Sequence, residues 1–184
     1  MVDICRMSQM SRTTFYDLFD GISDCLTYAF GDAYDRLIAP TKKAREDGAP
    51  WLEELTRSVG AFYLAAAENP LLAELCLVHS AGAVEEARGH DFEAAVGAIA
   101  EVIGDGRETG HDGHTEAEHS FRQIDPKDIL ARGIVATAAL RVRQGKAALL
   151  PEHRDEMVML VVSTLFGTDA MATAQQQLAS GRFY

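Results

Sequence analysis

Apolar residues recur along most of the chain at spacings of three and four, the period of a helix that buries one face. Hardly any segment shows the apolar–polar alternation of a β-strand. The fold class expected is therefore all-α. The predicted helices span residues 1–7, 11–19, 26–38, 50–66, 70–80, 83–104 and 125–144, and a last helix begins at Pro151.

Prolines and glycines mark the expected helix ends. Pro40 should stop the third helix, because a proline ring cannot continue a helix. Asn69 and Asp125 each precede a proline and are expected to cap the free amides of the next helix. The glycines within residues 104–106 should end the preceding helix, and a polar, glycine-rich loop is expected over residues 106–120.

The last two predicted helices are apolar around much of their circumference, so each has to be covered on more than one side. Burial within one subunit is one explanation. The preferred explanation is an intermolecular helix bundle, which makes the protein a homodimer. The residues expected at the dimer interface are Ile129, Val135, Ala139, Val142, Leu160, Val161, Thr164 and Leu165.

Composition narrows the classes of partner. The chain has 184 residues, of which 47% are apolar, enough for a sizeable core. Its net charge of −11 repels phosphate, so any contact with nucleic acid must be local. No basic-then-apolar leader occurs and no uninterrupted apolar run approaches about 20 residues, so we expect a cytoplasmic protein without membrane partners.

Metal and enzyme chemistry have little support in the sequence. Cys5, Cys25 and Cys76 form no CxxC pair and are expected to be buried free thiols. Three histidines and several acids lie within residues 111–119, but they match neither HExxH nor a helical i, i+4 pair, so a solvated loop is preferred to a metal site. With no GxSxG, phosphate loop or triad, we expect no enzyme activity, no cofactor and no metal.

The segment from Gln9 to Gly21 carries the clearest candidate chemistry. A short helix, a break at residues 8–10 and a second helix capped by Ser11 form a predicted helix-turn-helix, whose second helix can enter a DNA major groove. An ordinary capped surface helix is the alternative. Phe15, Leu18 and Phe19 should face the core. Because hydroxyls and guanidinium groups donate to phosphates and base edges, the residues expected to contact DNA are Ser11, Arg12, Thr13, Thr14 and Tyr16.

The stretch from Val2 to Phe30 resembles the latter part of the DNA-binding domain of the TetR family of bacterial transcriptional regulators. The positions that carry the resemblance are Ile4, Met10, Ser11, Phe15, Tyr16, Phe19 and Leu26. It implies that residues 1–30 form a partial helix-turn-helix domain and residues 31–184 a ligand-binding and dimerisation domain. The family has a further helix before this stretch; a start assigned too far downstream, or a trimmed sequence, is the expected reason that it is missing.

Several positions depart from the family pattern. Gln9 replaces the usual turn glycine, Ile22 stands where a lysine usually contacts phosphate, and Asp17 lies on the recognition helix. Residues 1–30 contain two arginines against four aspartates, a net charge of −2. This leaves an alternative open: a dimeric ligand-binding or interaction protein of the same fold that has lost DNA binding.

The resemblance implies a ligand-responsive regulator, expected to be a repressor that a small effector releases from operator DNA. His79 is the one cationic group that stands out on the apolar faces of the central helices, so the effector is expected to be mostly apolar and neutral. The candidate pocket residues are Trp51, Phe62, Tyr63, Leu75, Val78, His79, Phe92, Phe121, Ile134, Thr137 and Met157.

Overall fold

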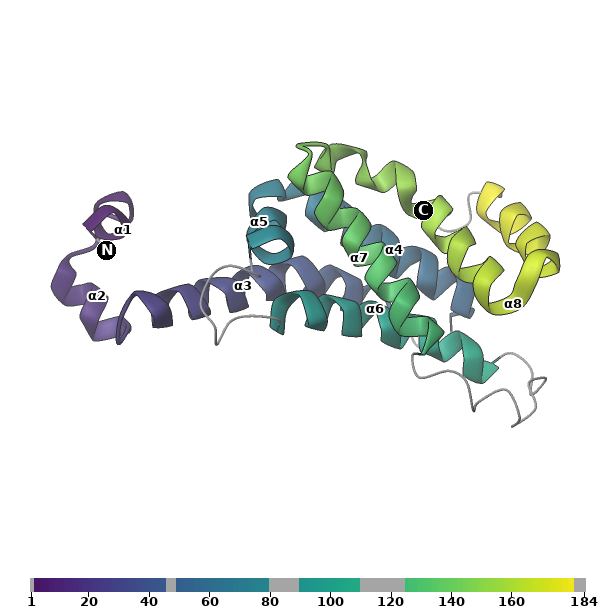
Figure 1. Ribbon diagram of the computed structural model, residues 1–184, viewed down its shortest axis with the longest axis horizontal. Helices are drawn as coiled ribbons and strands as arrows, with labels where there is room; N and C mark the ends of the chain where they lie inside the picture. Colours follow the sequence, from purple (N-terminus) through teal and green to yellow (C-terminus); the bar gives the residue numbers. More distant parts are fainter. Residues whose placement is uncertain (1, 46–48, 80–89, 110–124, 181–184) are drawn as a thin grey trace.

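The computed structural model describes residues 2–45, 49–79, 90–109 and 125–180, which form helices and short connections without a strand among them (Figure 1). This confirms the all-α class. The α-helices are α1 (Val2–Met7), α2 (Arg12–Leu18), α3 (Ile22–Lys43), α4 (Trp51–Glu68), α5 (Pro70–Glu74), α6 (His90–Thr109), α7 (Pro126–Arg143) and α8 (Arg154–Ala179). A π-helical turn, η1 (Leu75–His79), follows α5, and a 3₁₀ helix, η3 (Ala147–His153), precedes α8.

Helix α4 lies at the centre of a bundle formed with the second half of α3, α6, α7 and α8. Its side chains at Leu55, Val59, Phe62 and Tyr63 follow the helical period, and all four are 0% exposed. Burying one such apolar side chain stabilises the fold by roughly 1.5–3 kcal/mol. The apolar periodicity of this segment therefore produces the core of the bundle.

Neither Pro40 nor the glycines within residues 104–106 end a helix, contrary to the prediction. Helix α3 continues past Pro40 to Lys43, and the backbone N–H of Ala44 donates to the carbonyl of Pro40 at 3.0 Å. Buried Ile38 and Thr41 hold this last turn in the bundle, so packing outweighs the one hydrogen bond that proline removes. Helix α6 likewise runs through residues 104–106 to Thr109, because the chain there keeps helical geometry and takes no left-handed turn.

The predicted caps have different outcomes. Asp125 is confirmed, since its Oδ1 accepts a hydrogen bond from the N–H of Lys127 at 3.1 Å. The Asn69 prediction is wrong in detail, because the side-chain amide donates backward to the carbonyl of Ala65 at 3.3 Å and makes no cap bond to α5. Pro50 is the residue before α4 and not its first residue.

The last helix begins later than expected and is broken. Pro151 lies in η3, and α8 starts at Arg154. At Gly167 the backbone takes φ 80° and ψ −175°, a conformation that residues with a Cβ rarely adopt. The chain folds back there, so α8 consists of a first arm, residues 154–166, and a second arm, residues 168–179 (Figure 1). Ala174 and Leu178 of the second arm are buried.

One described segment, Ala147–Ala179, could cross a membrane by length and composition, with a mean hydropathy of 1.5 in its most apolar window. Only 22% of that window is buried in the subunit. Helix α4 and the following helix pass the same test as a pair, but they are bent by 105°. Core helices pass such a test too, so it is weak evidence for a membrane span. The low buried fraction does show that the subunit leaves much of this apolar segment uncovered.

Candidate nucleic-acid interface and ligand cavities

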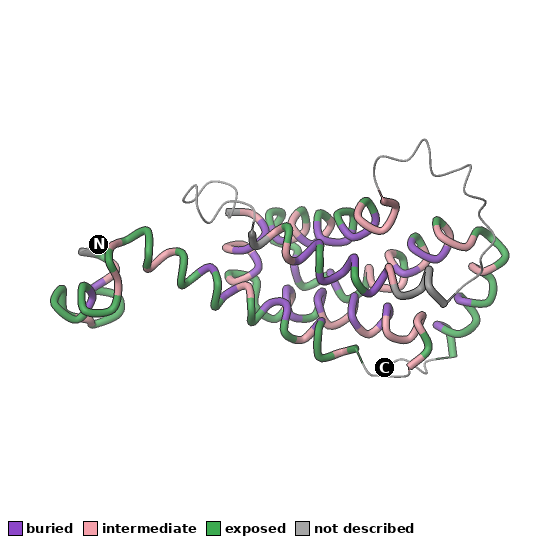
Figure 2. The backbone as a smooth tube through the Cα atoms, turned by 90° about the horizontal axis from the view of Figure 1, so that it is seen from below, coloured by how far each residue is buried: buried purple, intermediate pink, exposed green. Residues whose placement is uncertain are grey.

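Helices α1 and α2 form a small head that projects from the bundle at the beginning of α3 (Figure 1). The head and the first half of α3 are mostly exposed, whereas buried residues concentrate in the bundle (Figure 2). Cys5 and Phe15 are 8% and 1% exposed, yet neither belongs to the bundle core. The head therefore has a small apolar core of its own.

Aromatic rings join the head to α3. The ring of Phe15 lies 5.4 Å from that of Phe19, and the ring of Phe19 lies 5.9 Å from that of Tyr28. Phe15 and Phe19 are one helical turn apart and share a face. Leu18, which we expected to face the core as well, is 61% exposed, since its position lies on the flank of α2 that no other described element covers.

The turn between α1 and α2 is a Schellman motif. The N–H of Met10 donates to the carbonyl of Cys5 at 3.0 Å, and the N–H of Gln9 donates to the carbonyl of Arg6 at 3.4 Å. Gln9 has φ 55° and is the one non-glycine residue with a positive φ in the described part of the chain. Glycine is the usual residue at this position of the motif, so the backbone of Gln9 is strained.

The predicted DNA-contacting residues lie together at the exposed start of α2. Ser11 is confirmed as the N-cap, because its Oγ accepts a hydrogen bond from the N–H of Thr14 at 3.0 Å. The hydroxyls of Ser11 and Thr14 are also hydrogen-bonded, at 2.8 Å. Arg12 and Thr13 are exposed, and Tyr16 is 56% exposed. Hydroxyl and guanidinium donors are therefore presented to solvent on one side of the head.

The charge around this edge is unfavourable for phosphate. Arg6 forms an ion pair with Asp3 at 3.4 Å, and Asp17, Asp20 and Asp24 are exposed. The carboxylate of Asp24 accepts a hydrogen bond from the N–H of Asp20 at 3.1 Å, which fixes it at the start of α3. The net charge of −2 over residues 1–30 thus lies near the candidate interface.

The predicted effector residues that the structure describes are either buried in the bundle core or partly buried. Phe62, Tyr63 and Ile134 are at most 2% exposed. The hydroxyl of Tyr63 donates to the carbonyl of Ile134 at 3.2 Å, and burial raises the pKa of this phenol well above its ordinary value. The partly buried members of the set are Trp51, Leu75, Val78, Phe92, Thr137 and Met157. The side chain of His79 and the whole of Phe121 lie outside the described residues.

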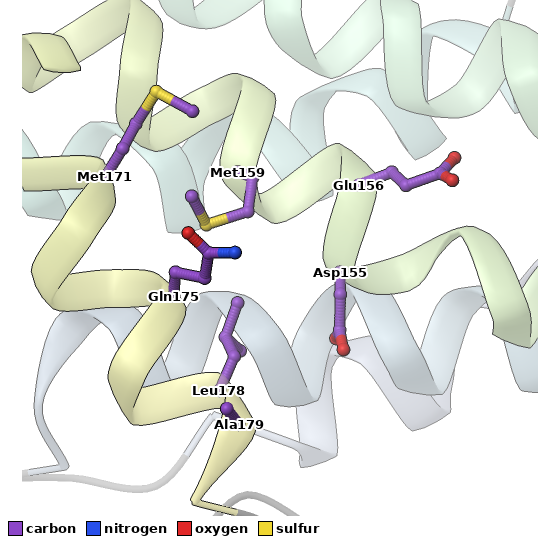
Figure 3. A pocket seen from close by; sticks show the side chains of 7 residues that line it. All are labelled: Asp155, Glu156, Met159, Met171, Gln175, Leu178 and Ala179. Atoms are coloured by element: carbon purple, nitrogen blue, oxygen red, sulfur yellow. The ribbon is translucent and has the colours of Figure 1, made fainter.

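Two cavities lined by described residues lie against α8, and Trp51 is the one member of the predicted effector set that lines either of them. The larger is about 530 Å³ and lies between the two arms of α8 (Figure 3). The smaller, about 300 Å³, lies between α8 and the start of α4 and includes Trp51 in its lining. Trp51 is fixed by its Nε1–H, which donates to the carbonyl of Val102 at 2.8 Å, and its ring lies 5.1 Å from that of Phe166.

The predicted dimer residues divide into two groups. Val135, Val142 and Val161 are buried inside the subunit, so the prediction that they lie on an interface is wrong. Ala139 and Leu165 are half-buried. The exposed members are Ile129, at 56%, Leu160, at 48%, and Thr164. When a helix is apolar on every face, its sequence does not show which face packs inside its own subunit.

A second series on α7 was missed from the sequence. Gly133, Ala136 and Leu140 are exposed and follow Ile129 at helical spacing, so the four residues form one stripe along α7. The sequence signal for this series is the spacing of its apolar and small residues at intervals of three and four. We name Ile129, Gly133, Ala136 and Leu140 the α7 stripe.

Cys5 and Cys76 are buried and Cys25 is half-buried, and all three are thiols. The His-rich segment 111–119 lies outside the described residues. Within the described ranges, no group of three His, Cys, Asp or Glu side chains could hold a metal ion. The structure therefore adds no candidate metal centre to the features above.

Comparisons with known proteins give no evidence on function, so the evidence comes from the head and the cavities. No protein-family model matches the chain, and no curated protein or solved structure matches it significantly.

Proposed function

We propose that the chain is a ligand-responsive DNA-binding transcriptional regulator similar to the TetR family, located in the cytoplasm and acting as a repressor. The observation that carries this proposal is the projecting head (Figure 1), in which a capped helix α2 follows a tight turn. The first residues of α2 are exposed to solvent. In a helix-turn-helix, the residues at the start of the second helix contact base edges in the major groove. We assign that role to Arg12 and Thr13, and contact with the backbone phosphates to Tyr16, because all three side chains are exposed.

Helix α3 supplies a mechanical link. Its 22 residues span about 33 Å, from the exposed head to the bundle core at Leu37 and Ile38. Two heads of a dimer must reach half-sites about 34–36 Å apart. A small change in the tilt of α3 would move the head by several ångströms, so an effector that shifts the packing around Leu37 would change the affinity for DNA.

The proposed regulator is a homodimer. The α7 stripe and the exposed residues Leu160 and Thr164 of α8 form apolar surface on neighbouring helices. Small residues such as Gly133 and Ala136 let two helices approach closely. A second copy would cover this surface in an intermolecular bundle.

The proposed effector is small, mostly apolar and neutral, and binds among the central helices. Their facing surfaces are apolar and aromatic, which is typical of a small-molecule site. Two buried hydroxyls, Thr41 Oγ1 on α3 and Ser58 Oγ on α4, have no hydrogen-bond partner among the described residues. Such unsatisfied groups favour a ligand that carries a hydrogen-bonding atom.

A second candidate is a dimeric ligand-binding or interaction protein of the same fold that has lost DNA binding. The negative charge of the head favours it, because phosphate contacts usually supply much of the affinity for DNA. The strained Gln9 turn and exposed Ile22, 42% accessible, are further departures from an efficient DNA-binding head.

A gel-shift assay distinguishes the two candidates. The full chain is titrated against the DNA upstream of its own gene, at several salt concentrations and with unrelated competitor DNA. A sequence-dependent shift that weakens with salt supports the regulator. No shift at low salt would overturn operator binding and support the second candidate.

A further inference from the structure

The break at Gly167 brings the second arm of α8 to the start of α4. The backbone there has φ 80°, and the chain turns back (Figure 1). Ala174 of the second arm and Val162 of the first arm line the same cavity of about 300 Å³, together with Trp51 and Leu52 of α4. In an unbroken helix these two α8 residues would lie about 18 Å apart. The cavity therefore depends on a glycine conformation, and unusual backbone conformations concentrate at ligand sites.

Two aromatic rings form part of the cavity lining. The ring centroids of Trp51 and Phe166 lie 5.1 Å apart, and the ring planes meet at 70°. The Nε1–H of Trp51 donates to the carbonyl of Val102 at 2.8 Å, which holds the indole in place. A flat aromatic ligand can stack on one of two such rings and direct its edge toward the other. Because the indole is already held, little ordering cost falls on ligand binding.

The lining of this cavity carries no charge. Its polar groups are the hydroxyl of Thr173 and the amide of Gln177, and its other side chains are apolar. Thr173 and Gln177 are exposed, so each can exchange a water molecule for a hydrogen bond to a ligand. A charged ligand would lose hydration without meeting an opposite charge. The lining therefore favours a neutral molecule with at most a few polar atoms.

We propose that the cavity between the start of α4 and the second arm of α8 binds a small neutral aromatic molecule. An apolar cavity of about 150 Å³ is enough for benzene, so about 300 Å³ has room for two fused rings. As the effector site of the regulator, the cavity rests on the function proposed above. The binding itself does not, and it is tested with the full chain in the absence of DNA.

The test compares three compounds of similar shape by isothermal titration calorimetry. They are 2-naphthol, 2-naphthoate, which is negatively charged at neutral pH, and decahydro-2-naphthol, which is neutral but not aromatic. We expect one saturable site per chain for 2-naphthol, binding at least about tenfold weaker for 2-naphthoate, and binding about three- to tenfold weaker for decahydro-2-naphthol. Trp51 is the single tryptophan of the chain, so 2-naphthol should quench its fluorescence with the calorimetric midpoint.

Two matched substitutions on the second arm locate the site. Ala170→Phe fills the cavity and should weaken 2-naphthol binding at least about tenfold, with an unchanged helix content by circular dichroism. Ala172→Phe places the same ring on an exposed residue outside the lining and should leave the affinity unchanged within about twofold. The proposal would be overturned by absence of saturable binding, by equal affinity for the three compounds, or by unquenched Trp51 at saturation. Equal effects of the two substitutions would overturn it too.

Discussion

The side chain of Ser11 accepts a hydrogen bond from the backbone N–H of Thr14 at 3.0 Å, and the two hydroxyl groups are 2.8 Å apart. This pair caps α2 and fixes the direction in which the helix leaves the turn. Arg12 and Thr13 lie between the two residues and are held exposed at the start of the helix. The local structure of the candidate DNA-binding edge therefore depends on a single serine.

Ser11→Ala should loosen α2 without affecting the bundle. Loss of an N-cap costs about 1 kcal/mol, which corresponds to roughly fivefold faster amide exchange. Hydrogen exchange followed by mass spectrometry should show this acceleration at Phe15 and its neighbours and none in α4. Thr13→Ala removes a hydroxyl that makes no cap and serves as the control. Equal exchange in wild type and Ser11→Ala would contradict the role assigned to the cap.

Gln9→Gly should stabilise the head. The position has φ 55°, which costs a residue with a Cβ about 1–2 kcal/mol, partly offset by the greater freedom of glycine when unfolded. We expect slower exchange of the α1 and α2 amides, by up to about fivefold. Gln9→Val should accelerate the same amides, because a branched side chain fits this conformation poorly. Faster exchange in Gln9→Gly would show that the turn does not have this geometry.

The local signals in the sequence predicted the local structure. Ser11 and Asp125 are caps because each bonds an amide two or three residues away, which the sequence can show. The end of α3 was predicted wrongly because the turn after Pro40 is held by packing in the bundle. The fold of α8 at Gly167 was not predicted, since one glycine in an apolar helix is usually tolerated and only tertiary contacts decide that it breaks.

The candidate sites also divide into features that local sequence signals predict and features that depend on tertiary packing. The exposed edge of α2 follows from the helix period and a cap, so its residues could be chosen from the sequence. The dimer residues on α7 and α8 could not, because apolar positions surround both helices and Val135 is covered by its own subunit. The cavity between the arms of α8 depends on the Gly167 break and had no signal of its own.

Tyr63→Phe should lower stability and change its pH dependence. The lost hydrogen bond to the Ile134 carbonyl costs about 0.5–1.5 kcal/mol at neutral pH. Burial raises the pKa of Tyr63 above about 10, which is the pKa of a tyrosine in the unfolded chain. The stability that the neutral phenol contributes is therefore complete below about pH 10. It is lost as the pH rises through the higher pKa of the folded state. The wild type should therefore lose up to about 1.4 kcal/mol more per pH unit above pH 10 than Tyr63→Phe does.

Urea denaturation at pH 8 and pH 11 measures both effects of the Tyr63 substitution. The free energies of wild type and Tyr63→Phe should converge, or cross, at the higher pH. The remaining tyrosines are present in both proteins and cancel in the comparison. A constant difference between the two proteins across this interval would contradict a buried, neutral phenol at Tyr63.

Charges on the α7 stripe should dissociate the proposed dimer. Ile129→Glu and Leu140→Lys place a charge where a partner would desolvate it. Sedimentation equilibrium should give about twice the chain mass of 20.0 kDa for the wild type and the single mass for either variant. Leu71→Lys changes an 81% exposed leucine on α5 and should stay dimeric. A monomeric wild type, or a Leu71→Lys variant that also dissociates, would contradict the proposed interface.

Affinity for selected DNA tests the central claim most directly. Duplexes enriched from genomic DNA by the full chain are titrated with wild type, Arg12→Ala and Arg36→Ala, and binding is followed by fluorescence anisotropy. Arg36 pairs with Asp32 on α3, outside the head, and is a control of equal charge. We predict that Arg12→Ala weakens binding by about 1–3 kcal/mol and that Arg36→Ala has little effect. No enrichment of any sequence, or equal affinities for wild type and Arg12→Ala, would contradict DNA recognition by the start of α2.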